Sequence, residues 1–171
     1  MVKRYQFPLL FLLVYGVLQL LYLNAPEWLV KDMLVERLTA EPAAWLINWL
    51  WPSAQALAHG GSIVSPRGTL NILRGCEGTE TLLMLLAAVF AARRMWRQLL
   101  LGVVLGCALV YLLNQVRIVG LYWIVVHHHD LFSLFHGTIA PLFIVGLSLG
   151  FFILWSRYPS RRAEVSHVPG A

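Results

Sequence analysis

Four segments of the chain are almost continuously apolar, and stretches that contain polar and charged residues separate them. They span about 7–23, 73–92, 98–118 and 137–156. A helix needs roughly 20 residues to cross the hydrocarbon core of a bilayer. Each segment approaches that length, the second only if its helix begins near Leu73. The pattern therefore predicts an all-α membrane protein, in which four spans form a helical bundle.

The first segment also has the length of a signal peptide. No small-residue cleavage site follows it, and the chain continues through a polar and aromatic stretch at 21–28. We therefore expect the first segment to be retained as a membrane anchor rather than removed.

The connection between the first two spans, residues 24–72, has patterns of its own. Residues 43–59 are apolar and rich in tryptophan, which predicts an amphipathic helix lying in the membrane interface. Ser65-Pro66-Arg67-Gly68 has the chemistry of a type I turn. Thr69-Leu70-Asn71-Ile72 then alternates polar and apolar residues. We expect a short β-hairpin that leads the chain to Cys76.

Composition agrees with a membrane location. Hydrophobic residues make up 59% of the 171 residues and charged residues 12%, whereas soluble domains carry roughly 25% charged residues. Lipid must therefore cover part of the apolar surface. The length predicts a single domain, which we place at 1–157, followed by a basic cytoplasmic tail at 158–171.

The charged residues predict the direction of the spans. One end of the predicted bundle has eight basic residues and one acid, whereas the other end has five basic residues and seven acids. The eight are Lys3, Arg4, Arg93, Arg94, Arg97, Arg157, Arg161 and Arg162. The positive-inside rule places this end and both termini in the cytoplasm. Residues from about 24 to 75 and from about 118 to 136 then face the periplasm or exterior. Because the basic residues cluster at span ends, the net charge of +5 does not indicate a nucleic-acid partner.

Three polar residues near the outer boundary of the membrane form a candidate site. Cys76, Arg117 and His136 lie 17, 20 and 21 residues from the nearest cytoplasmic arginine of their spans. At 1.5 Å per helical residue these separations are about 26, 30 and 32 Å. The three residues stand on different spans, so a compact bundle would bring them together. A disulfide between Cys76 and Cys107 is not expected, because Cys107 lies at a different depth.

This combination of side chains has a chemical logic. A cysteine attacks as the thiolate, and a nearby histidine can take its proton and return it to a leaving amine. An arginine stays cationic and can hold an oxyanion or a carboxylate. Each residue alone also has a structural interpretation, as a small buried side chain, an interfacial anchor or a helix cap. Their common depth on three spans favours a site.

The motifs around these residues resemble those of the exosortase/archaeosortase family. They are Cys76-Glu77-Gly78 at the outer end of one span, Asn114-Gln115-Val116-Arg117-Ile118 at the end of the next, and His136-Gly137-Thr138-Ile139-Ala140-Pro141 opening the last. The resemblance covers about residues 40–155. The chain looks most like the compact exosortase H type.

The resemblance implies a membrane cysteine endopeptidase or transpeptidase with Cys76, Arg117 and His136 as catalytic residues. Its partners would be the lipid bilayer and exported proteins that end in a short motif, an apolar helix and a basic tail. Cleavage would take place on the outer face of the cytoplasmic (inner) membrane. No cofactor is implied, because a thiol, an imidazole and a guanidinium suffice for acyl transfer.

Four further residues are candidates for substrate binding or support: Arg74, Glu77, Gly78 and Asn114. Glu77 departs from the family pattern, which often has Ser or Asn after the cysteine. A carboxylate beside the thiol opposes thiolate formation, so we expect Glu77 to pair with Arg74 or Arg117. Glycines at 75 and 78 would let a peptide backbone come close.

Two other interpretations remain open. The chain could be a non-enzymatic membrane component for assembly of exported polysaccharide or protein. It could also be a metal-dependent hydrolase that uses the histidines at 127–129 with Glu77 or Glu80. Three consecutive histidines cannot share one helical face, so we expect no metal site. We prefer His136 to these histidines because it opens the last span.

Overall fold

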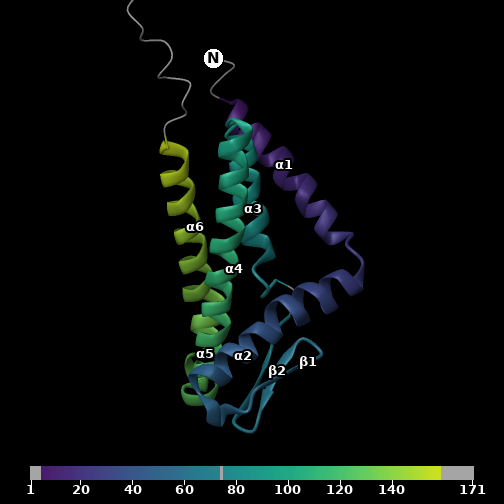
Figure 1. The fold of residues 1–171 in the computed structure, drawn as a ribbon, viewed down its shortest axis with the longest axis vertical. Helices are drawn as coiled ribbons and strands as arrows, with labels where there is room; N and C mark the ends of the chain where they lie inside the picture. The colour runs from purple at the N-terminus through teal and green to yellow at the C-terminus, as the bar shows by residue number, and fades with distance from the viewer. Residues whose placement is uncertain (1–4, 74, 159–171) are drawn as a thin grey trace, which may run out of the picture.

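The computed structural model describes residues 5–73 and 75–158 and is mostly helical. Arg74 and the predicted tail beyond Tyr158 lie outside the described residues. The largest helices are α1 (Gln6–Leu23), α3 (Thr79–Ala91), α4 (Trp96–His127) and α6 (Ala140–Arg157). Helices α3, α4 and α6 run along the long axis of the molecule, and α1 slants away from them (Figure 1). Within the described residues, three helical segments are long and apolar enough to cross a membrane, namely Gln6–Leu23, Trp96–His127 and His129–Arg157.

Helix α3 is shorter than the second predicted span. It has 13 residues, which correspond to about 20 Å, and it begins at Thr79 rather than near Leu73. The reason is local: Gly75 and Gly78 have φ angles of +96° and +79°, which a right-handed helix cannot contain. Helix α3 nevertheless packs against α1, α4 and α6. The count of four spans stays a prediction.

The start of α1, the α3–α4 turn and the end of α6 lie at one end of the bundle (Figure 1). Arg94 in the turn donates a hydrogen bond from Nη2 to the carbonyl of Ser156. The rings of Phe7 and Phe152 approach with their centroids 6.1 Å apart. We call this end the arginine end, and the opposite end, which carries the strands, the sheet end.

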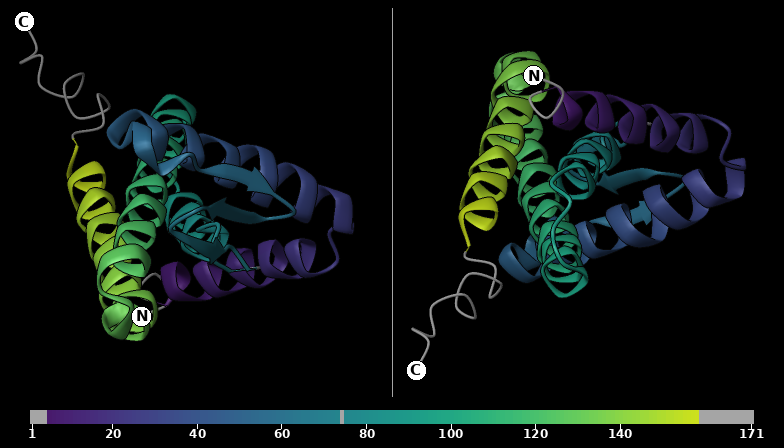
Figure 2. Two further views of the ribbon diagram at one scale, coloured as in Figure 1. Left: turned by 90° about the horizontal axis from the view of Figure 1, so that it is seen from below. Right: turned by 90° about the horizontal axis from the view of Figure 1, so that it is seen from above.

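The segment after α1 forms a continuous helical rod. It consists of the π-helix η2 (Leu29–Ala40) and α2 (Glu41–Leu50), and the backbone stays helical where they join. Figure 2 shows α1 and this rod diverging from their shared turn, with the strands and α3 between them. The rod ends at Leu50 because Trp51 precedes Pro52, and a residue before proline avoids the helical conformation; its φ and ψ are −134° and 85°.

The helix expected over 43–59 is therefore wrong in its second half. A short 3₁₀ turn, η3 (Pro52–Ala54), is followed by strand β1 (Leu57–His59). Strands β2 (Ser62–Ser65) and β3 (Gly68–Asn71) form an antiparallel hairpin in the register Ser65 with Gly68. The sheet has the order β1-β2-β3, so the hairpin predicted from the turn sequence lies within a three-stranded sheet.

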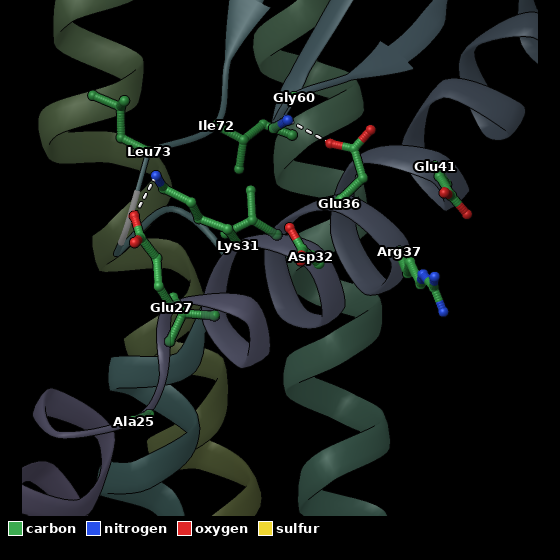
Figure 3. A pocket seen from close by; sticks show the side chains of 13 residues that line it. Ala25, Glu27, Lys31, Asp32, Glu36, Arg37, Glu41, Gly60, Ile72 and Leu73 are labelled. Atoms are coloured by element: carbon green, nitrogen blue, oxygen red, sulfur yellow. Dashed lines mark hydrogen bonds and ion pairs between the residues drawn. The ribbon is translucent and has the colours of Figure 1, made fainter.

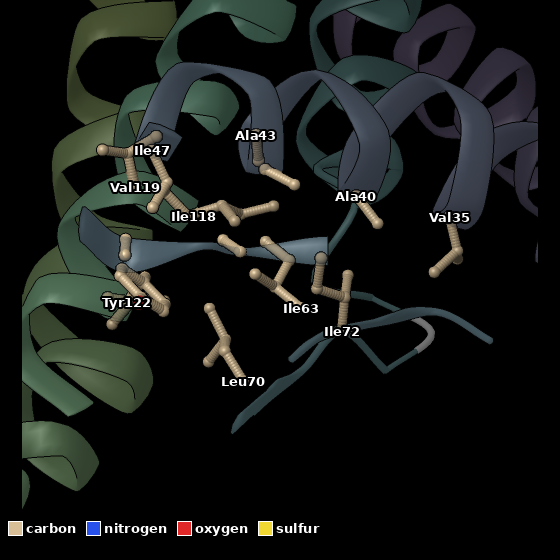
Figure 4. Packing of buried hydrophobic residues seen from close by; sticks show 14 residues of the cluster. Val35, Ala40, Ala43, Ile47, Ile63, Leu70, Ile72, Ile118, Val119 and Tyr122 are labelled. Carbon is tan, nitrogen blue, oxygen red and sulfur yellow. The ribbon is translucent and has the colours of Figure 1, made fainter. Parts of the chain in front are cut away.

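Helix α4 continues to His127, nine residues beyond Ile118, where the membrane span predicted over 98–118 ends. Its extension packs into a core shared with the rod and the sheet (Figure 4). Ile118 meets Ile47 and Ile63 in this core, and the Tyr122 hydroxyl donates a hydrogen bond to Ser65 Oγ at 2.9 Å. The buried residues that follow Arg117 thus pack in a protein core rather than against lipid; they are Ile118, Val119, Leu121 and Tyr122. Three short helical elements, η4 (His129–Leu131), α5 (Phe132–Leu134) and η5 (Phe135–Ile139), then lead into α6.

Candidate active site

Cys76 lies in the short loop between β3 and α3, outside the helices. Gly75 and Gly78 have positive φ angles and turn the chain in this loop. Helix α3 then begins at Thr79, three residues after Cys76. Gly78 also lies close to α4, because a Cβ at this position would be 3.0 Å from Asn114 Cγ. Asn114 is buried, and its Oδ1 has no hydrogen-bond partner among the described residues. Gly78 and Asn114 therefore bring the cysteine loop into direct contact with α4.

His136 faces the thiol. Its Nε2 lies 3.8 Å from Cys76 Sγ, within reach of a proton transfer between the two groups. The imidazole stacks on Phe132, one turn earlier, with ring centroids 5.2 Å apart and an angle of 15° between the planes. This stacking fixes the plane of the ring and directs Nε2 towards the cysteine loop.

Arg117 completes the group from α4. It lines a small pocket together with Cys76 and His136, and the other lining residues are Leu70, Asn71, Ile72, Ile118 and Leu121. Within the described part of the chain, its buried Nε has no hydrogen-bond partner. Arg117 thus brings a positive charge to the pocket, and a guanidinium can donate hydrogen bonds to a negative charge that develops on a substrate oxygen.

The surroundings of Cys76 have opposing effects on its thiol. Burial raises the pKa of Cys76, whereas the positive charge of Arg117 lowers it. The carboxylates of Glu77 and Glu80 raise it further by smaller amounts. Because burial is the largest of these effects, the resting thiol is protonated at neutral pH. A nucleophilic role for Cys76 therefore requires a base, and His136 is the one within reach.

Glu77 does not pair with an arginine in the described residues. Its Oε1 accepts a hydrogen bond from the Tyr22 hydroxyl of α1, and its Oε2 accepts one from the Gly75 backbone N–H at 2.6 Å. Of the two arginines expected as partners, Arg117 forms no ion pair with Glu77 in these residues, and Arg74 lies outside them. Sequence reasoning missed Tyr22, although it stands 18 residues after Arg4, a depth close to that of Cys76 from Arg93.

The run of histidines lies at the end of α4, and all three are exposed. His127 Nδ1 lies 3.0 Å from the carbonyl oxygen of Trp123, and the two rings stack at 4.9 Å. Within residues 5–73 and 75–158, no cluster of three or more His, Cys, Asp or Glu is arranged to hold a metal ion.

A cavity with charged walls runs along η2 and ends at Leu73 (Figure 3). Its charged residues are Glu27, Lys31, Asp32, Glu36, Arg37 and Glu41. Glu27 and Lys31 form an ion pair, and Glu36 accepts a hydrogen bond from the backbone N–H of Gly61. The carbonyl of Leu73 accepts the N–H of Cys76 at 2.9 Å. The cavity therefore reaches the start of the cysteine loop.

An apolar crevice lies between α1, α3 and α6. Its lining residues are Phe7, Phe11, Thr81, Met84, Leu85, Ala88, Val145, Ser148, Leu149 and Phe152. Phe7 and Phe152, whose rings approach each other, line it at the arginine end. Its other end reaches Thr81, five residues after Cys76.

Comparison with known proteins identifies one family. The family model described as transmembrane exosortase (Exosortase_EpsH) matches residues 1–156. No curated protein and no solved structure matches the chain. The match extends over the candidate site and over the helices up to the penultimate residue of α6, and it confirms the resemblance that the three motifs indicated.

Proposed function

From the premise that this chain belongs to the transmembrane exosortase family, we propose that it is a cysteine endopeptidase or transpeptidase. Its substrates are exported proteins with a C-terminal sorting signal. The observation that carries the proposal is the approach of His136 Nε2 to within 3.8 Å of Cys76 Sγ, with Arg117 lining the same pocket. The three residues come from the loop before α3, from α4 and from η5.

The geometry supports acyl transfer by the following steps. His136 takes the proton of Cys76, and the thiolate attacks the carbonyl carbon of the scissile peptide bond. Arg117 stabilises the oxyanion, or holds a carboxylate of the substrate. The protonated His136 then gives its proton to the leaving amine, and the acyl-thioester remains on Cys76. Water or the amine of an acceptor molecule attacks the thioester and releases the product.

The charged cavity and the apolar crevice fit a substrate with a short motif followed by an apolar helix. The charged cavity along η2 ends at Leu73 and would receive the motif. The apolar crevice begins near Thr81 and continues towards the arginine end, so it would receive the beginning of the apolar helix. Cys76 lies between the two openings in the sequence, where the boundary between motif and helix would pass.

We also propose that α3 crosses the membrane with the other three helices. Both termini and the arginine end then face the cytoplasm, and the sheet end with Cys76 faces the periplasm or exterior. The basic residues at the arginine end support this direction through the positive-inside rule.

Processing of an exported reporter that carries such a C-terminal signal tests the proposal. Cys76→Ala, Arg117→Ala and His136→Ala should each lower the amount of processed reporter about 100-fold or more, while the variants still insert in the membrane. Matched controls are Cys107→Ala and His127→Ala, which change the same residue types outside the pocket and should process normally.

Each alternative has its own outcome. Unchanged processing or assembly with Cys76→Ser would contradict the enzyme and favour a non-enzymatic assembly component. Loss of activity with a chelator, or on replacement of His127, His128 and His129 together by alanine, would instead favour a metal-dependent hydrolase.

A further inference from the structure

The cysteine loop is held from two sides by the residue that follows the cysteine. One oxygen of Glu77 accepts the hydroxyl of Tyr22, and the other accepts the backbone N–H of Gly75. Tyr22 is 8% exposed and lies in the last turn of α1, which is 55 residues away in sequence. A carboxylate that accepts two hydrogen bonds has a fixed direction, because both oxygens are engaged.

These two hydrogen bonds limit the unfavourable effect of the Glu77 carboxylate on ionisation of the Cys76 thiol. A free carboxylate beside Cys76 could turn towards the sulfur and repel a thiolate. It could also turn towards Arg117 and neutralise the charge that favours the thiolate. Either movement opposes ionisation of Cys76. The hydrogen bonds from Tyr22 and Gly75 prevent both movements.

We propose that Tyr22 and Glu77 are a positioning pair for the nucleophile. The pair holds the loop in the conformation that directs Cys76 towards His136, and it holds the carboxylate away from the sulfur. Neither residue touches the reacting atoms. The inference rests on the proposed function, since it assigns Cys76 the role of nucleophile.

Other charged or titratable groups of the described residues also face Cys76. Arg117 faces it from α4, His136 from η5, and Glu80 from the first turn of α3. Among the described residues that hold Glu77, only Tyr22 belongs to another helix. A change at Tyr22 should therefore reach Cys76 through Glu77.

The pH dependence of Cys76 alkylation measures this effect without a substrate. The full-length protein in lipid nanodiscs, with Cys107→Ala as background, is treated with iodoacetamide between pH 6 and 11, and the modified Cys76 is followed by mass spectrometry. Burial raises the pKa of the thiol, so the alkylation rate should rise with pH and have its midpoint above that of an ordinary cysteine. Tyr22→Phe should move this midpoint up by about half a pH unit or more, whereas Glu77→Gln should move it down.

Two comparisons make the result decisive. Tyr22→Phe should have no effect when Glu77→Gln is already present, because no carboxylate remains to be released. Tyr15→Phe removes a hydroxyl from the same helix and should leave the midpoint unchanged. Equal midpoints for Tyr22→Phe and Tyr15→Phe, or an equal effect of Tyr22→Phe with and without Glu77→Gln, would overturn the proposal.

The alkylation test examines the positioning pair and the reporter test examines the peptidase function, so either proposal can be contradicted without the other. If the midpoints shift as expected and no variant affects reporter processing, the pair positions Cys76 but the proposed peptidase function is wrong. If processing depends on Cys76 and the midpoints do not shift, the peptidase stands and the positioning pair does not. Phenylalanine preserves nearly the whole volume of Tyr22, so loss of folding is not expected to obscure the comparison.

Discussion

Gly78 satisfies two separate requirements of the site. Its φ of +79° lies in the left-handed region, and the space where a Cβ would stand is taken by Asn114. The sequence indicated Cys76, Arg117, His136, Gly78 and Asn114, because both the depth of a residue in the membrane and a short motif can be read from positions along the chain. Tyr22 could not be linked to Glu77 in this way, since their contact depends on how α1 packs against the bundle.

Replacing Gly78 by alanine should therefore damage the site. The left-handed conformation alone costs roughly 1–2 kcal/mol for a residue with a Cβ, and the contact of 3.0 Å with Asn114 adds to this cost. We expect Gly78→Ala to lower reporter processing at least about tenfold. Gly137→Ala is the matched control, because it lies next to His136 in the motif and has nothing within 4 Å of the added Cβ. Similar processing by the two variants would contradict the role given to Gly78.

At the scale of elements, the helices followed from the apolar pattern, whereas several of their ends did not. The rod ends before Pro52 because a residue that precedes proline avoids the helical conformation, and this cause can be seen in the sequence. Helix α4 extends beyond Arg117 because Ile118 and its neighbours pack in a protein core, and residues of the rod and of the sheet form the rest of that core. The predicted interfacial helix shared its residues with β1, whose pairing with β2 is a tertiary contact that periodicity does not reveal.

The packing of α4 on α6 gives a prediction at this scale. Trp155 lies over Gly102, where an added Cβ would be 2.6 Å from the indole Cε2, and the indole N–H is held by the Gln98 carbonyl at 3.1 Å. Gly102→Ala should therefore force α4 and α6 apart, at a cost of about 1–3 kcal/mol. Thermal unfolding in detergent should show a midpoint several degrees lower. Gly120→Ala, on the same helix with nothing within 4 Å, should not lower it, and an equal loss in both would contradict this account of the interface.

At the scale of the whole molecule, the arrangement is a bundle capped at one end by a small unit of rod and sheet. The composition and the arginines predicted a membrane protein and a direction, because both depend on where charge can be placed along the chain. They did not predict that the last ten residues of α4 join the cap. Cys76, Arg117 and His136 lie at the junction between bundle and cap, so the site depends on both parts.

Fusions with alkaline phosphatase, which is active only outside the cytoplasm, test the direction of each helix. Fusions that end at Gly60 or at His128 should be active, and those that end at Met95 or at Tyr158 should be inactive. The fusion at Met95 decides whether α3 crosses. Activity at both Met95 and Tyr158 would show that only three helices cross and that the termini lie on opposite sides.

The shortness of α3 has a consequence for how a substrate is found. The helix covers about 20 Å of a hydrocarbon core of about 30 Å, so in a four-span arrangement Cys76, just before its start, lies at the outer boundary of the hydrocarbon rather than raised above the membrane. Irregular backbone at that depth must satisfy its hydrogen bonds inside the protein, as the bonds of Gly75 and Cys76 to Glu77 and Leu73 do. A protein anchored by one helix would then meet the thiol by lateral diffusion in the plane of the bilayer. The search is two-dimensional, and the scissile bond need not leave the lipid boundary to be cut.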